Sequence, residues 1–404
     1  MDYRETVDYL FSQLPMFQRV GAAAYKEDLS NTIALCEAFD HPERRFKCIH
    51  IAGTNGKGSV AHTLAAIFQS CGYRTGLFTS PHLKDYRERI RINGEMIPED
   101  EVIKFVAAFQ AKNLDLQPSF FELTCVMGFD YFAHKEVDIA ILEVGMGGRL
   151  DSTNVVIPEL SIITHIGRDH QQFLGDTLEL IAAEKGGIIK AKVPVVIGEN
   201  TFAARNVLEN IADERDSKRY DVFASSPILE TDLNGSYQRE NMRTVAMAVK
   251  AMKEAGWELE EAKVRSGAQN VVELTGLRGR WESIGEMPTV ITDVGHNESG
   301  VQQVVDFLRK QTYVRLHMVW GMVGDKDAKS ILSLLPKSAT YYWCRPDVPR
   351  GKDAEELAAQ GNKQALLGKV YPSVKIALET AIAESQLNDL IFVGGSVFVV
   401  AEVL

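Results

Sequence analysis

Apolar and polar residues follow two alternating patterns along the first part of the chain. Short, nearly continuous apolar runs predict buried strands at 46–52, 75–79, 137–144, 160–165 and 193–197. Between them, apolar residues recur at helical spacing and predict helices at 58–70, 99–112, 120–134, 177–190 and 241–255. This alternation is typical of right-handed βαβ units around a mostly parallel sheet.

A second alternating series begins near residue 289 and predicts a separate α/β domain. Its strands are expected at 289–293, 315–319, 339–343 and 389–393, and its helices start near Ser299, Asp327, Asp353, Val374 and Val397. Helices are also expected at 3–14 and 26–39, whereas 214–240 is polar, poorly periodic and left unassigned. A chain of 404 residues exceeds one ordinary core. We therefore expect domains at 1–276 and 277–404.

The turn after the first central strand, Gly53-Thr54-Asn55-Gly56-Lys57-Gly58-Ser59, has the composition of a phosphate-binding loop. Glycines allow backbone N–H groups to surround an anion, and the following helix N-terminus adds partial positive charge. Lys57 is placed to reach the outer phosphates, and Ser59 to bind a phosphate oxygen or its magnesium ion. The alternative is an ordinary glycine-rich strand-to-helix turn.

Polar residues also follow other strands at the same edge of the expected sheet. Glu143 ends an apolar run before Gly145-Met146-Gly147-Gly148, which favours a magnesium ligand, with an ion pair to Arg149 as the alternative. Ser80 is a candidate oxygen ligand in a tight turn, or simply a turn residue. Taken alone, His170 reads as a structural residue, because magnesium prefers oxygen ligands.

Two further segments have both a chemical and a structural interpretation. Lys185, alone, reads as a side chain that complements the C-terminal dipole of its helix. Asp293-Val294-Gly295-His296-Asn297 follows the first strand of the second domain and suits a ligand edge, but Asn297 could equally cap the next helix.

Composition limits the class of protein. The net charge of −11 disfavours nucleic acid and membrane surfaces as partners, and no apolar run is long enough to span a bilayer. The five cysteines are scattered, and the N-terminal residues show no secretory pattern, so we expect a cytoplasmic protein with reduced thiols. The basic residues of Lys84–Arg89 alternate with acids, which is typical of a solvated face.

Taken together, these motifs resemble the folylpolyglutamate synthase/dihydrofolate synthase family, within the wider Mur ligase group, over nearly the whole chain. The segments that carry the resemblance are Gly53–Ser59, Ser80–Leu83, Glu88–Ile90, Glu143–Asp151, Asp169–His170, Leu174–Gly175, Thr177, Ile181–Ala182, Glu184–Lys185, and Asp293 with His296–Asn297. The implied fold is α/β: a P-loop-containing, Mur-ligase-like ATPase domain with a mostly parallel sheet, and a smaller C-terminal Rossmann-like domain that carries the glutamate-ligase function.

The resemblance implies an ATP- and Mg²⁺-dependent amide ligase. Such enzymes join L-glutamate to dihydropteroate, to the γ-carboxylate of a folate, or to both, through an acyl phosphate. A carboxylate is a poor electrophile, so phosphorylation supplies a leaving group and the protein mainly positions reactants and neutralises charge. The expected partners are small molecules, namely dihydropteroate or a reduced folate, L-glutamate and ATP, and the expected state is a monomer.

The resemblance also assigns roles to individual residues. Nucleotide binding falls to Asn55, Gly56, Lys57, Gly58, Ser59, Asn241, Arg280 and Asp293, with His296 nearby. Metal binding falls to Ser59, Ser80, Glu143, His170 and Lys185, the last as a carbamate formed with CO₂. Pterin binding falls to Arg19, Gly21, Ala22, Ala23, Phe121, Leu150, Asp151 and Ser152, and catalysis to Lys57, Lys185, His170 and His296.

Two other functions remain compatible with the sequence. The first is another Mur-type ligase, acting on a nucleotide-linked cell-wall precursor; only about fifty residues precede the phosphate loop, which we expect to be too few for a domain that binds such a precursor. The second is a non-catalytic nucleotide-binding protein, which the presence of Lys57, Glu143, His170 and Lys185 disfavours.

Overall fold

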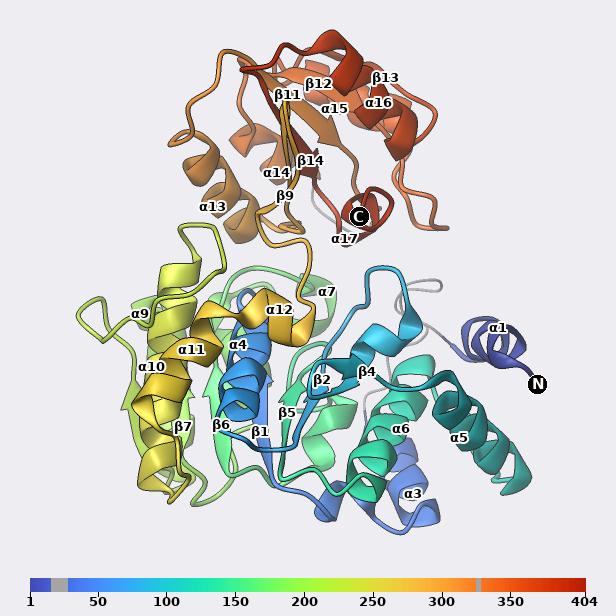
Figure 1. The fold of residues 1–404 in the computed structure, drawn as a ribbon, viewed down its shortest axis with the longest axis vertical. Helices are drawn as coiled ribbons and strands as arrows, with labels where there is room; N and C mark the ends of the chain where they lie inside the picture. The colour runs from blue at the N-terminus through green and yellow to red at the C-terminus, as the bar shows by residue number, and fades with distance from the viewer. Residues whose placement is uncertain (16–27, 325–327) are drawn as a thin grey trace. The chain divides into compact units, whose positions relative to one another are not determined.

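The computed structural model describes residues 1–15, 28–324 and 328–404. These residues form two compact units (Figure 1). Unit 1 comprises Met1–Asp232 and Gln238–Gly276, and unit 2 comprises Leu233–Tyr237 and Leu277–Leu404. The chain thus enters unit 2 for five residues before it returns at Gln238, which differs from a single division at 276/277.

Unit 1 is built on an eight-stranded sheet in the order β4-β3-β2-β5-β1-β6-β7-β8. Its strands are β1 (Cys48–Ala52), β2 (Thr75–Phe78), β3 (Ile90–Ile92), β4 (Glu95–Met96), β5 (Ile139–Glu143), β6 (Leu160–Ile163), β7 (Val195–Ile197) and β8 (Arg219–Asp221). All neighbouring pairs from β2 to β8 are parallel, and the pairs β2–β3 and β3–β4 are antiparallel. The mostly parallel α/β sheet expected from the sequence is confirmed.

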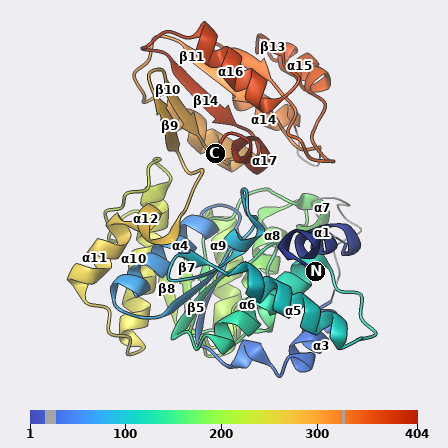
Figure 2. The same cartoon turned by 45° about the vertical axis from the view of Figure 1, so that its right-hand side comes forward.

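Helices cover both faces of this sheet. They are α1 (Tyr3–Gln13), α3 (Ser30–Ala38), η2 (Pro42–Arg44), α4 (Lys57–Ser70), η3 (Tyr86–Arg89), α5 (Glu99–Ala111), α6 (Phe120–His134), η4 (Ser152–Val155), α7 (Gln171–Leu174), α8 (Leu178–Gly186), α9 (Phe202–Glu214), α10 (Gln238–Glu254), α11 (Glu261–Gln269) and α12 (Val271–Thr275). Helices α10, α11 and α12 pack against α4 (Figure 1). Helix α1 packs against α5 (Figure 2).

Alternate residues of the strands point into different cores. In β5, Ile139 and Ile141 join a core with α4, α10 and α11, whereas Ala140 and Leu142 join one with α3, α5 and α6. A third core, under α8 and α9, receives Ile163 of β6. Because both faces are buried, the central strands are apolar at nearly every position, which explains their clear sequence signal.

Unit 2 contains a six-stranded sheet in the order β13-β12-β11-β14-β10-β9, in which only the β9–β10 pair is antiparallel. Its strands are β9 (Glu282–Glu286), β10 (Thr289–Thr292), β11 (Leu316–Trp320), β12 (Thr340–Trp343), β13 (Gly368–Val370) and β14 (Leu390–Gly394). Its helices are α13 (Glu298–Leu308), α14 (Ala328–Leu334), α15 (Ala354–Asn362), α16 (Val374–Glu384) and α17 (Val397–Ala401). Two cores lie on the two faces of the sheet.

The sequence patterns located the central strands of both sheets but missed several peripheral elements. Strands β3, β4, β8 and β13 have only two or three residues each, too few to show a period. The sequence pattern did not predict helix α9, because two of its three buried positions, Ala204 and Ala212, carry small side chains that weaken the apolar signal. None of the helices in the described parts of the chain is long and apolar enough to cross a membrane.

Candidate functional site

The candidate site of unit 1 lies at the carboxyl ends of four adjacent parallel strands. Strand β5 lies between β2 and β1, with Glu143 opposite Ile51, and β6 lies on the other side of β1, with Ile163 opposite Ala52. The segments that leave these strands therefore emerge side by side. In open α/β sheets this edge, next to the central strand, is where ligands bind.

The glycine-rich turn after β1 is held against the segment that follows β6. Thr54 donates through its backbone N–H to the carbonyl of His165 at 2.7 Å, and its hydroxyl donates to the carbonyl of Gly167 at 2.9 Å. The hydroxyl of Thr164 donates to the carbonyl of Asn55 at 2.8 Å. These bonds fix the turn before any ligand is present, and α4 begins directly after it at Lys57.

Gly56 is the turn residue whose replacement we expect to be most revealing. It has φ of +90°, and a Cβ there would lie 2.3 Å from Oδ1 of Asn241. Gly72 has nearly the same backbone angle, +93°, but a Cβ there meets nothing within 4 Å. Both alanine variants should lose about 1 kcal/mol of unfolding free energy from backbone strain.

Only Gly56→Ala should also displace Asn241, and we expect it to raise, at least about tenfold, the KM for the nucleotide that the sequence predicts at this turn. Steady-state kinetics together with urea unfolding of both variants would measure this. Equal kinetic losses in Gly56→Ala and Gly72→Ala would show that Asn241 does not act on the nucleotide.

Two lysine ammonium groups converge on one backbone oxygen of the turn. Lys57 Nζ and Lys185 Nζ each lie 3.0 Å from the carbonyl oxygen of Gly53, so the two nitrogens are at most 6.0 Å apart. Lys57 also donates to the carbonyl of Thr54 at 3.3 Å. Among the described residues, no carboxylate forms an ion pair with either lysine. Two lysine nitrogens without an ion-pair partner among these residues, at a glycine-rich turn, favour the binding of an anion.

Lys185 reaches this position from the last turn of α8. It lies four residues after the buried Ile181 and so shares its inward face. Its partner segment approaches closely because Gly148 has no side chain; a Cβ there would lie 2.7 Å from the carbonyl oxygen of Lys185. Lys185 lies in the last turn of α8, where a cation complements the helix dipole, but it is only 4% exposed and therefore is not an ordinary surface lysine.

Burial changes the protonation of Lys185. Desolvation, followed by the neighbouring charge of Lys57, lowers the pKa of Lys185 to about 7, although Asp169 and Asp151 act in the opposite direction. A lysine in this environment is partly unprotonated near neutral pH, which a surface lysine is not. The amine is therefore available for reaction as a nucleophile.

Oxygen donors for a divalent cation lie at the ends of β2 and β5. Glu143 is buried, and its Oε2 accepts the backbone N–H of Ser80 at 3.1 Å. Arg149, the alternative partner predicted for Glu143, forms an ion pair with Glu184 at 2.9 Å. His170 has φ of +50° at the start of α7, and its Nε2 lies 3.9 Å from Asp169.

The candidate donors Ser59, Ser80, Glu143 and His170 can bind magnesium only if a bound ligand or water supplies the remaining coordination positions. Within the described ranges, no cluster of three or more His, Cys, Asp or Glu side chains has the geometry of a metal site. Two hydroxyls, one carboxylate and one imidazole leave coordination positions for phosphate oxygens and water, as is usual for magnesium at a nucleotide.

A buried amide, which sequence reasoning missed, connects two nucleotide-binding candidates. Gln238, the first residue of α10, donates from Nε2 to Ser59 Oγ at 3.2 Å and accepts from Asn241 Nδ2 at 2.8 Å. Its spacing of three residues before Asn241, on one helix face, is the signal that could have found it. Gln238 itself lies within 214–240, the polar stretch to which the sequence pattern assigns no element.

The described pterin-side candidates lie in the segment after Glu143 and on α6, which carries Phe121. Asp151 is buried and accepts from the backbone N–H groups of Met146 and Thr153 at 2.9 and 3.0 Å, and burial raises its pKa. Phe121 lies so close to Gly145 that a Cβ there would be 2.5 Å from its Cζ. Leu150 is half-buried, and Ser152 is buried. Arg19, Gly21, Ala22 and Ala23 lie outside the described residues.

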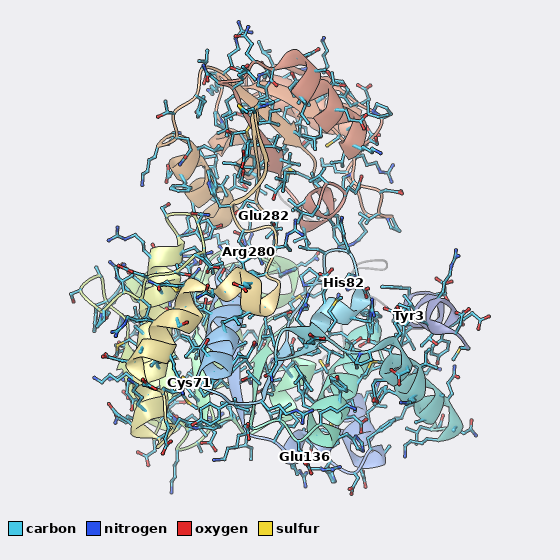
Figure 3. The ribbon with its side chains drawn as sticks, viewed as in Figure 1. Tyr3, Cys71, His82, Glu136, Arg280 and Glu282 are labelled. Atoms are coloured by element: carbon cyan, nitrogen blue, oxygen red, sulfur yellow. The ribbon has the colours of Figure 1, made fainter. Side chains whose placement is uncertain are left out.

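The remaining candidates belong to unit 2. Asp293 is buried and accepts from Tyr237 Oη at 2.5 Å and from the backbone N–H groups of Trp281 and Gly295 at 2.9 and 2.8 Å. Arg280 is half-buried, and His296 Nδ1 donates to the carbonyl of Val294 at 2.9 Å. Asn297 accepts from the backbone N–H of Gly300 and caps α13, so the capping interpretation of this residue is confirmed. Figure 3 labels Arg280 at the start of unit 2.

Two family models match most of the chain. The Mur ligase middle domain matches residues 51–249, and the Mur ligase, glutamate ligase domain matches residues 279–397. A dihydrofolate synthase/folylpolyglutamate synthase of Escherichia coli K12 is 32% identical over 88% of this chain and 85% of its own length. A probable bifunctional folylpolyglutamate synthase/dihydropteroate synthase of Haloferax volcanii is 32% identical over 100% of this chain, which spans 50% of that relative.

Solved structures that resemble this chain also include folylpolyglutamate synthase/dihydrofolate synthase enzymes. The structure of E. coli FolC in complex with DHPP and ADP has a TM-score of 0.87 and 28% identity, over 100% of this chain and 97% of that one. A bifunctional folylpolyglutamate synthase/dihydrofolate synthase with Mn, AMPPNP and L-glutamate bound has a TM-score of 0.84 and 27% identity, over 100% and 97%. Likeness of this extent covers both units of the chain.

Proposed function

This chain belongs to the folylpolyglutamate synthase/dihydrofolate synthase family of Mur ligases, and we propose that the site on the glycine-rich turn of unit 1 supports its reaction. The protein is an ATP-dependent ligase that uses a divalent metal ion. It joins L-glutamate to dihydropteroate, to the γ-carboxylate of a folate, or to both. The residues that act in this reaction are our proposal.

The convergence of Lys57 and Lys185 on the carbonyl of Gly53 carries the proposal. We assign the ATP phosphates to the turn formed by Asn55, Gly56, Lys57, Gly58 and Ser59. Backbone N–H groups and the N-terminus of α4 would face an anion bound there, and Lys57 would supply a full positive charge. The bonds from Thr54 and Thr164 keep this geometry fixed, so little reorganisation is needed when ATP binds.

We propose that Ser59, Ser80, Glu143 and His170 hold the divalent ions. A bound magnesium ion would neutralise charge that develops on the transferring phosphate. Gln238 donates to Ser59 Oγ and so leaves the hydroxyl proton free to be directed at a phosphate oxygen. Glu143 is held by the backbone N–H of Ser80, which couples the ends of β2 and β5.

The chemistry requires two steps. The carboxylate of the pterin acid attacks the γ-phosphorus of ATP, which forms a C–O–P bond and releases ADP. The amine of L-glutamate then attacks the acyl carbon, phosphate leaves with the C–O bonding pair, and the amine loses a proton. Since both steps need in-line reactants and charge compensation, fixed cations and a preformed loop are the main contribution of the protein.

For Lys185 we propose modification by CO₂. The unprotonated Nζ attacks CO₂, one N–H proton is released, and a carbamate anion replaces the amine. Burial beside Lys57 favours this outcome, because it converts a repelling cation into an anion that Lys57 can neutralise. The carbamate oxygens would then be magnesium ligands.

The remaining assignments follow from the family resemblance. We assign Asn241, Arg280 and Asp293 to nucleotide binding, and His296 to a position near the nucleotide. We assign Phe121, Leu150, Asp151 and Ser152, with Arg19 and Gly21–Ala23, to the pterin, since Phe121 offers an aromatic face to a flat ring. We also propose that domain 1–276 carries ATP and the pterin, domain 277–404 acts in glutamate ligation, and the enzyme works as a cytoplasmic monomer.

A substrate comparison tests the proposed function. We expect glutamate-dependent ADP release with dihydropteroate, with tetrahydrofolate, or with both, and none with muropeptide precursors. A coupled ADP assay with and without L-glutamate would measure this. Turnover only with muropeptide precursors would favour another Mur-type ligase, and ATP binding without turnover on any acid would favour a non-catalytic protein; either result would refute the proposal.

A further inference from the structure

Arg89 is a buried cation in a segment whose sequence is typical of a solvated face. It is the last residue of η3 and is only 3% exposed. Its Nε donates to Nδ1 of His82 at 2.8 Å, and its guanidinium carbon lies 5.2 Å from the ring centroid of Phe120. The prediction of a solvated face for 84–89 is therefore wrong for Arg89 and for Tyr86, which is also 3% exposed.

The acids next to Arg89 in the sequence are engaged elsewhere. Glu88 accepts the backbone N–H groups of Leu83, Lys84 and Asp85 at 2.8 to 2.9 Å. Asp85 forms an ion pair with Arg87 at 2.7 Å. Within the described ranges, no carboxylate oxygen lies within 4.0 Å of the Arg89 nitrogens as an ion pair.

His82 cannot supply the missing charge. A guanidinium N–H can only donate, so Nδ1 of His82 accepts this bond, and an imidazole has no negative charge that could compensate the cation. Burial lowers the pKa of Arg89 to about 10, which still leaves it protonated at pH 7. A buried cation without an ion-pair partner is costly, and such cations are normally paired with an anion.

The position of Arg89 connects it with the proposed ligase site. Its carbonyl accepts the backbone N–H of Thr79 at 3.0 Å, and the next residue, Ser80, donates to Glu143. The charge of Glu143 is among those that act on the guanidinium. Figure 3 labels His82, the hydrogen-bond partner of Arg89, in the loop that follows β2.

The ring of Phe120, which lies over this cation, belongs to a cluster of aromatic rings. Phe120 stacks on Phe11 at 5.3 Å between ring centroids and meets the edge of Tyr86 at 5.8 Å, and Phe11 lies 5.9 Å from the ring of His82. A planar guanidinium beside aromatic rings suits a carboxylate carried by a largely apolar, flat molecule. Its fork can bind both carboxylate oxygens at once.

We propose that Arg89 binds the carboxylate of an organic acid substrate, namely the carboxylate that the reaction phosphorylates. The inference rests on the proposed function and assigns a binding role to Arg89, to which the sequence analysis gave none. The same chemistry could come from a second source, the α-carboxylate of L-glutamate. If Arg89 binds the phosphorylated carboxylate, its replacement weakens binding of the pterin acid. If it binds the α-carboxylate, its replacement weakens binding of L-glutamate.

The test is a comparison of an acid ligand with its uncharged analogue. Affinities of pteroate and of its carboxamide, in which –CONH₂ replaces –COO⁻, would be measured by calorimetry on wild type, Arg89→Gln, Arg89→Lys and the control Arg87→Gln. We expect wild type and Arg87→Gln to prefer the acid about tenfold to a hundredfold. We expect Arg89→Gln to show no preference and Arg89→Lys to show an intermediate one.

Kinetics separate the two carboxylate sources. If the KM for L-glutamate rises in Arg89→Gln while the acid-over-amide preference is kept, the assignment to the phosphorylated carboxylate is overturned in favour of the α-carboxylate of glutamate. If both are unchanged, Arg89 binds no carboxylate. If circular dichroism shows that Arg89→Gln does not fold, the acid-over-amide preference of Arg89→Lys becomes the test of the proposal. Absence of glutamate-dependent ADP release in wild type would refute the proposed function, whereas the binding comparison stands apart from turnover.

Discussion

The variant Lys57→Ala should lose ATP-dependent ligase turnover almost completely while it keeps its fold. Lys57 supplies a full positive charge at the glycine-rich turn, where Nζ contacts the carbonyls of Gly53 and Thr54. Removal of one fixed charge at a phosphoryl-transfer site costs about 10³-fold or more in kcat. Its part-buried hydrogen bonds to backbone carbonyls should add only about 1 kcal/mol to stability.

Lys190→Ala is the matched control for this prediction. Lys190 Nζ also donates to a backbone carbonyl, that of Asn154 at 2.9 Å, but it is not part of the proposed site. It should lose comparable stability and keep most of its activity. ADP release and thermal unfolding of both variants would be compared; near-wild-type turnover by Lys57→Ala would remove Lys57 from the phosphate site.

Lys57→Ala has a second expected effect, on Lys185. The charge of Lys57 helps to lower the pKa of Lys185, so its removal should raise that pKa and leave fewer unprotonated amines at pH 7. If the carbamate forms, its occupancy in Lys57→Ala should fall. Intact-mass measurement under a controlled CO₂ pressure would detect the change.

The variant Lys185→Ala should be inactive and partly rescued by added acetate or bicarbonate. With a pKa of about 7, roughly half of the Lys185 amines are unprotonated at pH 7, against fewer than about one in a thousand for an ordinary lysine. The proposed carbamate places an anion in the space that Lys185 occupies, and a small carboxylate can enter that space only when the side chain is removed. Lys185→Met, which fills the space, should resist rescue.

The lowered pKa of Lys185 also predicts the direction in which the stability of the unmodified protein changes with pH. In the unmodified protein the folded-state pKa of Lys185 lies below its unfolded value, so between about pH 7 and the ordinary lysine range the unfolded chain holds more protons. Stability should therefore rise with pH in that window, and Lys185→Met should lack this contribution. Urea unfolding in CO₂-free buffer measures it. An active wild-type enzyme without added mass at Lys185 would contradict the carbamate.

Much of this site could be predicted from the sequence because parallel strands buried on both faces give strong apolar signals. Gly53–Ser59 and Glu143 follow such strands directly, and the structure places their segments at one sheet edge. Lys185 could not be assigned from its own helix, because its burial depends on the close approach of Gly148 from another segment.

For Arg89 the sequence pattern predicted exposure, but the side chain is buried. Alternating charges at 84–89 are typical of a solvated surface. The pattern does not show which of the charged side chains is buried. Here Asp85 and Arg87 pair with each other, and the Arg89 guanidinium lies over the ring of Phe120 in α6. Gln238 was missed for a related reason, since a lone amide at the start of a helix has no composition signal.

The most direct test of the central claim is a crystal structure with AMPPNP and Mn²⁺, whose anomalous signal marks the metal. We expect the triphosphate along Gly53–Ser59, with Lys57 Nζ moved from the Gly53 carbonyl to the phosphates, and Mn²⁺ bound by Glu143 and Ser80. A triphosphate bound away from this turn, or Mn²⁺ with no ligand from Glu143, would contradict the account.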